Sequence, residues 1–272
     1  MGGLPYLAHA RGFLPGRRFV YVADREHFPY GEKSRSEIVA ATLSVAERLI
    51  RRENPQLVVV ACNTMSVVAL SDLRARFSVP FVGVVPAVKP AAGLSRRGRV
   101  GVLATRRTVE GEYLRGLIER HAAGCEVVSL SSAALVEFVE KSLYQAGPEE
   151  REKRVQQEVD RFTSEGIDAL VLGCTHFLHL EREFRSLLDA RGIVLVDSRD
   201  GVSRQAKRVL AAGGGPPQAA AGGGPAQAAA GGGPAQAAAD CDDTLYVTGP
   251  LRLEERYEWF AREYDLRLEG GL

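Results

Sequence analysis

Two cysteines stand in matching positions after apolar runs, and their thiols are the side chains best suited to do chemistry. The first run, 57–60, leads through a small residue to Cys62 and then to two short polar residues. The second run, 169–172, leads through a glycine to Cys174, which polar residues again follow. A thiol normally titrates near about 8.5, so a modest shift of its pKa makes it a usable base at neutral pH.

Each apolar run is typical of a buried strand in a parallel sheet, and a helix is expected to start just beyond it. Ligands of open α/β sheets bind beyond the carboxyl ends of the strands, so both thiols would reach the ligand. The two motifs lie about one small domain apart along the chain. The simplest geometry therefore places one cysteine in each of two domains, facing a shared cleft. Aligned N–H groups at the helix starts would stabilise the thiolates.

The alternative interpretation of each cysteine is structural, because free cysteine is often a small buried side chain. The matching contexts of Cys62 and Cys174 favour chemistry, whereas Cys125 and Cys241 lack such flanks and are interpreted as structural. The sequence has no CxxC pair, which argues against a zinc knuckle or a thioredoxin-type site. Cysteines scattered without short spacing indicate reduced thiols of the cytoplasm.

Further candidate ligand-binding residues follow the two cysteines. Asn63, Thr64 and Thr175 are short polar residues at predicted helix starts, where they would cap the helix. Their side chains and the nearby N–H groups could also hold a carboxylate or a phosphate, and the two roles are compatible. His176 is interpreted as tuning the adjacent thiol. The pair Tyr30-Gly31, taken on its residues alone, is typical of a turn.

Alternating strand and helix patterns predict an α/β fold of two pseudo-symmetric, doubly wound parallel-sheet domains with the active site between them. The predicted strands are 18–23, 57–60, 80–85, 99–104, 126–130, 169–172, 193–196 and 244–247. The predicted helices include 34–52, 66–77, 109–121, 133–144, 149–165 and 252–264. Two prolines near residue 86 mark a crossing between domains. The first domain would comprise 1–86 and 199–272, and the second 87–198.

A repeat interrupts the first domain at 213–239, where GGGPPQAAA is followed by two copies of GGGPAQAAA. Such a segment can bury almost no apolar surface, so we expect a flexible linker. The remaining composition is that of a globular protein, with 45% apolar residues and a net charge of +1. This charge gives no reason to expect nucleic acid or a membrane surface as a partner. We expect no secretion, because the N-terminus lacks the charged and apolar pattern of a signal peptide, and the sequence has no apolar run long enough to span a membrane.

Three motifs, in their order and spacing, resemble those of glutamate racemases. They are Pro29-Tyr30-Gly31, Ala61-Cys62-Asn63-Thr64 and Gly173-Cys174-Thr175-His176. The resemblance covers nearly the whole chain except the repeat, and it includes Tyr246-Val247-Thr248-Gly249 near the end. It implies interconversion of L- and D-glutamate without pyridoxal phosphate or metal, which supplies D-glutamate for bacterial peptidoglycan. Glutamate is then the expected partner, and a homodimer is left open.

The resemblance also implies a role for each matched residue. Cys62 and Cys174 would transfer the protons, one on each face of the α-carbon. The residues that would bind glutamate are Tyr30, Gly31, Asn63, Thr64, Thr175 and His176. Glu140 falls, in a looser alignment, where the family has an acid near the histidine. Two alternatives stay open: an aspartate racemase, which shares the two-cysteine plan, and a thiol redox sensor, which the absence of a neighbouring resolving cysteine disfavours.

The chain departs from the family at its start. The family opens with a strand and Asp-Ser-Gly before the Gly-Gly-Leu found here at 2–4. On this resemblance we expect the first strand to be missing, together with an aspartate that assists one thiol and a serine that helps bind substrate. The chain would then be either a protein whose start is assigned too late or a truncated, weakly active or non-catalytic ligand-binding relative.

Overall fold

The computed structural model describes residues 1–213, 243–249 and 254–272. In these residues strands and helices alternate and the sheets are parallel, which confirms the predicted α/β fold. The repeat, apart from its first glycine, lies outside the described residues, so its role as a linker stays a prediction. None of the described helices has the length and apolar character that a membrane crossing requires.

The first half of the molecule combines the start and the end of the chain. Its elements are α1 (Leu4–Phe13), β1 (Val20–Ala23), η1 (Tyr30–Glu32), α2 (Arg35–Glu53), β2 (Val58–Val60), α3 (Asn63–Arg76), β3 (Phe81–Gly83), α10 (Arg199–Ala211), β8 (Thr244–Val247), α11 (Glu255–Glu263) and β9 (Arg267–Gly271). The helix α2 begins at the expected capping box, in which Ser34 and Glu37 each accept a hydrogen bond from the other's backbone N–H. The strand β9 was not predicted from the sequence.

The second half is continuous in sequence. Its elements are α4 (Val88–Leu94), β4 (Arg99–Ala104), α5 (Arg106–Val109), α6 (Glu112–His121), β5 (Glu126–Ser131), α7 (Ala133–Lys141), α8 (Pro148–Thr163), β6 (Ala169–Leu172), η2 (Thr175–Leu180), α9 (Glu181–Asp189) and β7 (Val194–Val196). The strands form one parallel sheet in the order β5-β4-β6-β7. All four residues of β6 are buried, as its unbroken apolar run predicts.

The strands of the first half form two separate sheets. One has the order β1-β8-β9 and the other pairs β2 with β3, and every pair is parallel. The register of the first sheet sets Val20 beside Thr244 and Thr244 beside Arg267. In the described sheets β1 and β2 each have one paired edge, and their other edges face the same cavity.

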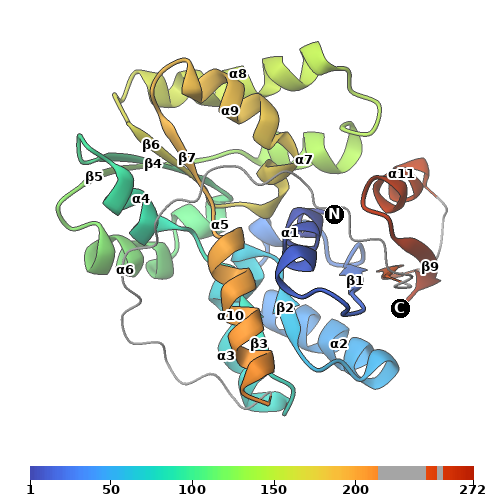
Figure 1. Ribbon diagram of the computed structural model, residues 1–272. Coiled ribbons are helices and arrows are strands. Elements are labelled where there is room, and N and C mark those ends of the chain that lie inside the picture. Colours follow the sequence, from blue (N-terminus) through green and yellow to red (C-terminus); the bar gives the residue numbers. More distant parts are fainter. Residues whose placement is uncertain (214–242, 250–253) are drawn as a thin grey trace.

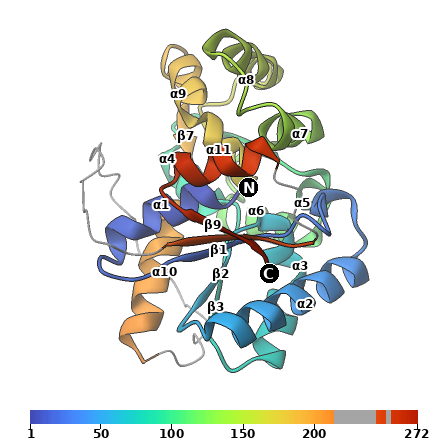
Figure 2. The same ribbon diagram turned by 90° about the vertical axis from the view of Figure 1, so that its right-hand side faces the viewer.

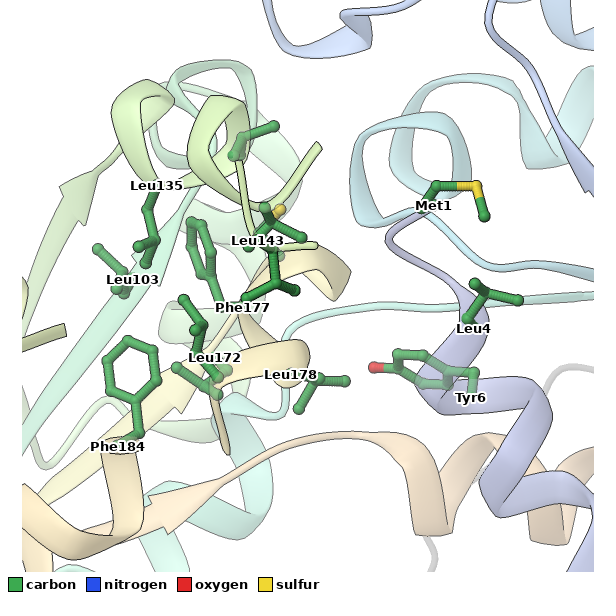
Figure 3. Packing of buried hydrophobic residues seen from close by; sticks show 14 of the residues in the cluster. Met1, Leu4, Tyr6, Leu103, Leu135, Leu143, Leu172, Phe177, Leu178 and Phe184 are labelled. Atoms are coloured by element: carbon green, nitrogen blue, oxygen red, sulfur yellow. The ribbon is translucent and has the colours of Figure 1, made fainter. Parts of the chain in front are cut away.

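One apolar core joins the two halves. Figure 1 shows the second half above the first, with α1 lying between them, and Figure 2 shows α11 close to α1 and the N-terminus. Leu4 on α1 is fully buried and belongs to the same cluster as Phe177 and Leu178 on η2. Figure 3 shows these side chains where α1 meets the second half. The start of the chain is therefore part of the contact between the halves.

Candidate active site

Cys62 stands where β2 ends and α3 begins. Its backbone is extended, and its carbonyl oxygen accepts the first helical hydrogen bond, from the N–H of Ser66. The helix starts at Asn63, three residues earlier than the periodicity predicts. Backbone N–H groups of Thr64 and Met65 donate to the Cys62 sulfur. The thiol therefore lies at the positive end of α3, as the sequence predicts.

Cys174 has the same place in the second half, after β6. It is extended and 5% exposed, and N–H groups of His176 and Phe177 donate to its sulfur. The segment that follows is a 3₁₀ helix of six residues, η2, and the α-helix α9 starts only at Glu181. The prediction of a helix directly after this cysteine is thus met by the tighter 3₁₀ form.

Burial sets the acidity of both thiols. It raises the pKa of Cys62 and raises the pKa of Cys174 to about 12, although the backbone N–H groups act in the opposite direction. The N–H groups at the helix starts thus favour the thiolates, as expected, but desolvation outweighs them, so neither pKa moves toward neutral pH. A negative charge on Cys62 also raises the pKa of Cys174.

His176 connects Cys174 to a buried carboxylate. Its Nδ1 atom lies 3.7 Å from the Cys174 sulfur, and its Nε2 atom lies 2.8 Å from Glu140 Oε1. The terminal ammonium group of Met1 also pairs with Glu140. Burial opposes the charge on Glu140, but these two partners outweigh it and hold its pKa well below the ordinary value. Burial lowers the pKa of His176 more strongly than Glu140 raises it, so the neutral imidazole is favoured.

Asn63 carries a buried side-chain amide whose hydrogen-bonding groups are unused within the described part of the chain. The side chain is 3% exposed, yet neither its oxygen nor its nitrogen has a hydrogen-bond partner among the described residues. A buried amide without partners costs free energy, which a bound polar ligand would recover. Thr64, next in the chain, is also buried, and its hydroxyl lies 2.9 Å from that of Thr105 in the second half.

Tyr30 and Gly31 form part of the short helix η1. The Tyr30 hydroxyl donates to the Asp24 carboxylate, which also accepts a 2.7 Å hydrogen bond from Thr248. Burial and the Asp24 charge both raise the pKa of Tyr30, so this phenol stays protonated. A Cβ atom added at Gly31 would stand 3.2 Å from Thr105, so little room is left for a side chain there. The pair is thus more than a surface turn, because it contacts the second half.

A cavity of about 610 Å³ opens between these groups. Of the predicted site residues, those in its wall are Tyr30, Cys62, Thr175 and His176. Gly31, Asn63, Thr64 and Cys174 lie outside this wall. The structure therefore gathers all eight around the junction of the halves, but only four of them touch the open volume.

A family comparison decides the relationship. The family model for Asp/Glu/hydantoin racemases matches residues 6–205. The chain belongs to this family.

Relatives in the racemase family include proteins named glutamate racemase. The one from Treponema pallidum is 37% identical over 274 residues, covering 100% of this chain and 93% of that protein. The one from Pectobacterium atrosepticum is 42% identical over 218 residues, covering 80% of this chain and 76% of that protein. The solved Escherichia coli glutamate racemase, in complex with L-glutamate and the activator UDP-MurNAc-ala, has a TM-score of 0.82 at 32% identity. That match covers 100% of this chain and 94% of the other, and confirms the two-domain α/β fold.

Two threonines of this racemase chain were missed from the sequence. Thr105 and Thr108 follow the end of β4, and their hydroxyls lie 3.1 Å apart beside Thr64. The signal was present, because short polar residues follow this buried strand as they follow the cysteine strands. These threonines were not predicted as site residues because no cysteine stands beside them.

Three neighbouring side chains of this racemase chain carry atoms that could coordinate a cation. Ligand atoms of Asp24, Glu26 and His27 lie within 4.8 Å of one another. The carboxylate of Asp24 already accepts hydrogen bonds from Thr248 and Tyr30 and lies 2.9 Å from His27 Nδ1. Its oxygens are therefore satisfied by the protein, and the arrangement favours a hydrogen-bond network that holds η1.

Proposed function

We propose that this chain is a glutamate racemase that interconverts L- and D-glutamate by a two-base proton transfer, without a cofactor. The observation that carries the proposal is the paired placement of Cys62 and Cys174. Each thiol follows a parallel strand, the strands belong to different halves, and a negative charge on Cys62 raises the pKa of Cys174. Racemisation needs one base on each face of the α-carbon, and one thiol from each half of the molecule would supply them.

The proposed step conserves protons and charge. One cysteine thiolate removes the α-proton of glutamate, which leaves a carbanion stabilised by the neighbouring carboxylate. The other cysteine thiol donates its proton to the opposite face, so that the product has the other handedness. The two sulfurs exchange protonation states in one turnover, and the reverse reaction starts from that exchanged state.

The same residues would bind the substrate. The free amide of Asn63 and the N–H groups at the start of α3 and η2 can hold carboxylate oxygens, including the charge that develops during proton removal. The ammonium group of bound glutamate would bring a positive charge near the sulfurs, and this lowers the pKa that burial has raised. Tyr30, Gly31, Thr64, Thr175 and His176 complete the proposed binding set.

The expected setting follows from the substrate. D-glutamate would serve bacterial peptidoglycan synthesis, and the reduced thiols that the chemistry requires suit the cytoplasm. The relatives named glutamate racemase support glutamate over aspartate as the substrate.

Isotope exchange tests the function directly. The protein is incubated with L-glutamate in deuterated water, and the α-proton signal is followed by NMR while the D-isomer is measured by chiral chromatography. We expect the α-proton signal to disappear as D-glutamate forms. A parallel incubation with L-aspartate separates the two racemase activities. Absence of exchange with both amino acids would contradict the proposal and favour a non-catalytic ligand-binding protein.

A further inference from the structure

His179 lies on the short helix that follows Cys174, but the proposed mechanism does not use it. It comes five residues after Cys174 and three after His176, within η2. The N–H groups that donate to the Cys174 sulfur, those of His176 and Phe177, belong to the same helix. A 3₁₀ helix has poor hydrogen-bond geometry and seldom exceeds about three or four residues, so the six residues of η2 depend on contacts from outside the helix.

Both ring nitrogens of His179 contact the first half of the molecule. Nδ1 lies 3.0 Å from the hydroxyl oxygen of Tyr264, and Nε2 lies 3.2 Å from the carbonyl oxygen of Met1. A carbonyl can only accept a hydrogen bond, so Nε2 carries the proton. Burial lowers the pKa of His179 to about 3, so the imidazole is neutral and Nδ1 accepts the hydrogen bond that Tyr264 donates. The neutral ring therefore has a partner for each nitrogen.

Aromatic side chains at α11 pack against the same imidazole. The ring centroid of Phe260 lies 5.2 Å from that of His179, the centroid of Tyr264 lies 5.6 Å from it, and both pairs meet edge to face. This geometry is favoured for ring pairs beyond the area that they bury. Phe260 is fully buried on α11, and Tyr264 caps the C-terminal end of that helix. A helix of the first half thus holds η2 near its end through two rings and a hydrogen bond.

The helix α11 also contacts the helix that carries Glu140. Arg256 Nη1 donates a 3.1 Å hydrogen bond to the Glu140 carbonyl oxygen, near the end of α7. The Glu140 side chain in turn lies 2.8 Å from His176 Nε2. Figure 1 and Figure 2 show α11 beside α7 at the junction of the halves. One helix of the first half therefore contacts both elements from which the Glu140–His176 pair comes.

We propose that His179 is a positioning residue, through which Tyr264 and Phe260 fix η2 so that Cys174 keeps its backbone hydrogen bonds. We call these three side chains, His179, Tyr264 and Phe260, the η2 clamp. Its part in catalysis rests on the proposed racemase function, because that function assigns the task to Cys174. Cys62 stands at the start of α3, a regular α-helix of 14 residues, so its surroundings should not depend on the clamp.

Thiol alkylation tests the η2 clamp without turnover. The protein is treated with iodoacetamide at about pH 8, where a fraction of the thiols is ionised, and the initial rates at Cys174 and Cys62 are followed by mass spectrometry of their peptides. We expect His179→Leu to speed the alkylation of Cys174 at least about fivefold, because a loosened η2 admits water and reagent to a sulfur that is now buried. The rate at Cys62, the internal control, should change less than about twofold.

A milder variant isolates the hydrogen bond of the η2 clamp. Tyr264→Phe keeps the ring and removes only the hydroxyl, so it should speed Cys174 alkylation by a smaller factor, and it decides the test if His179→Leu does not fold. Adding Tyr264→Phe to His179→Leu should have no further effect, because the shared hydrogen bond is already lost. The matched controls are His121→Leu and Tyr113→Phe, whose parent side chains lie exposed on α6. Urea titrations show which variants are folded.

Steady-state kinetics with glutamate tests the catalytic consequence. We expect His179→Leu to lower kcat at least about tenfold and to change KM less than about threefold. The reason is that misplacing the Cys174 sulfur affects the chemical step, whereas Asn63 and Thr64 of the first half would still bind the substrate. A rise in KM with unchanged kcat would assign His179 to binding and would overturn the positioning role.

The alkylation results separate this proposal from the racemase function. Unchanged alkylation of Cys174 in folded Tyr264→Phe would overturn the η2 clamp, even if the protein racemises glutamate. Equal acceleration at Cys174 and Cys62 would show that the two halves loosen as a whole, and would overturn it as well. Faster alkylation of Cys174 alone, in a protein without racemase activity, would support the clamp and contradict only the racemase function.

Discussion

At the scale of single residues, Cys62 and Cys174 have equivalent surroundings but different burial. Both follow a strand and receive backbone hydrogen bonds, yet Cys174 is more completely enclosed and has His176 beside it. Both thiols are weak acids because burial disfavours the thiolate. Under the proposed mechanism each thiol serves as the base in one direction and as the acid in the other.

Removing either sulfur should therefore stop the reaction in both directions. We expect Cys62→Ala and Cys174→Ala each to lower racemisation by about 10²–10⁴-fold or more, the usual scale of acid–base assistance. The matched control is Cys125→Ala, because Cys125 is a free thiol outside the cavity wall. Circular dichroism of glutamate measures the rate. Either variant retaining near-parental turnover in a folded protein would contradict the two-base assignment.

The raised thiol pKa values also predict a pH profile. One sulfur must be deprotonated before substrate binds productively, and its base form is scarce at neutral pH because its pKa lies above the ordinary value. Raising the pH increases that form, so kcat/KM should climb about tenfold per unit from pH 6 to about pH 8. Rates measured across this range in buffers of constant ionic strength check the slope. A flat profile would show that no thiol ionisation limits the free enzyme.

At the scale of elements, Asp168 joins the end of α4 to the start of β6. Its carboxylate accepts 2.7 Å hydrogen bonds from the N–H groups of Arg96 and Arg97, and a further one from Ser95. Burial alone would raise the pKa of Asp168, but these donors outweigh it and lower that pKa. The ionised carboxylate therefore stabilises the fold.

We expect Asp168→Asn to lower the free energy of unfolding by about 1–3 kcal/mol at pH 7. The folded pKa lies below the unfolded value of about 3.9, so the contribution is complete above that value and is lost as the pH falls through the folded pKa. The difference between parent and variant should thus shrink below about pH 4. Urea titrations at several pH values measure it, with the exposed Asp189→Asn as control. A difference that does not depend on pH would rule out the ionised carboxylate as the cause.

At the scale of the whole molecule, the two halves share one apolar core. Leu4 on α1 and Phe177 on η2 are fully buried in a single cluster, and hydroxyls of Thr64 and Thr105 meet across the halves. Neither half completes its core alone, so the halves should unfold together.

We expect one cooperative transition, seen equally by far-UV circular dichroism and by the fluorescence of Trp259, the single tryptophan, in the first half. Leu4→Ala should lower the free energy of unfolding by about 2–5 kcal/mol while the two probes stay coincident. The control is Leu94→Ala, because Leu94 is 39% exposed and should cost less than about 0.5 kcal/mol. Separate midpoints for the two probes would mean that the halves unfold independently.

The sequence by itself determined the strands that carry the cysteines. In an α/β protein, an unbroken apolar run that ends in small and polar residues is typical of a strand. The sequence also determined the alternation of elements, and it predicted a set of candidate site residues at strand ends. It missed β9, whose five residues include two glycines and acquire strand form through pairing with β8. The strand propensity of these residues is weak, so their extended conformation depends on pairing with β8.

The tertiary structure alone decided three things. It set the acidity of the thiols, because desolvation depends on every atom packed around a sulfur and not on its neighbours in sequence. It brought Thr105 next to Thr64 across a long stretch of chain. It also left β1 and β2 unpaired across a cavity, since pairing depends on which backbone edges meet in space. A one-dimensional pattern records which groups are present, whereas burial and contact are properties of the folded arrangement.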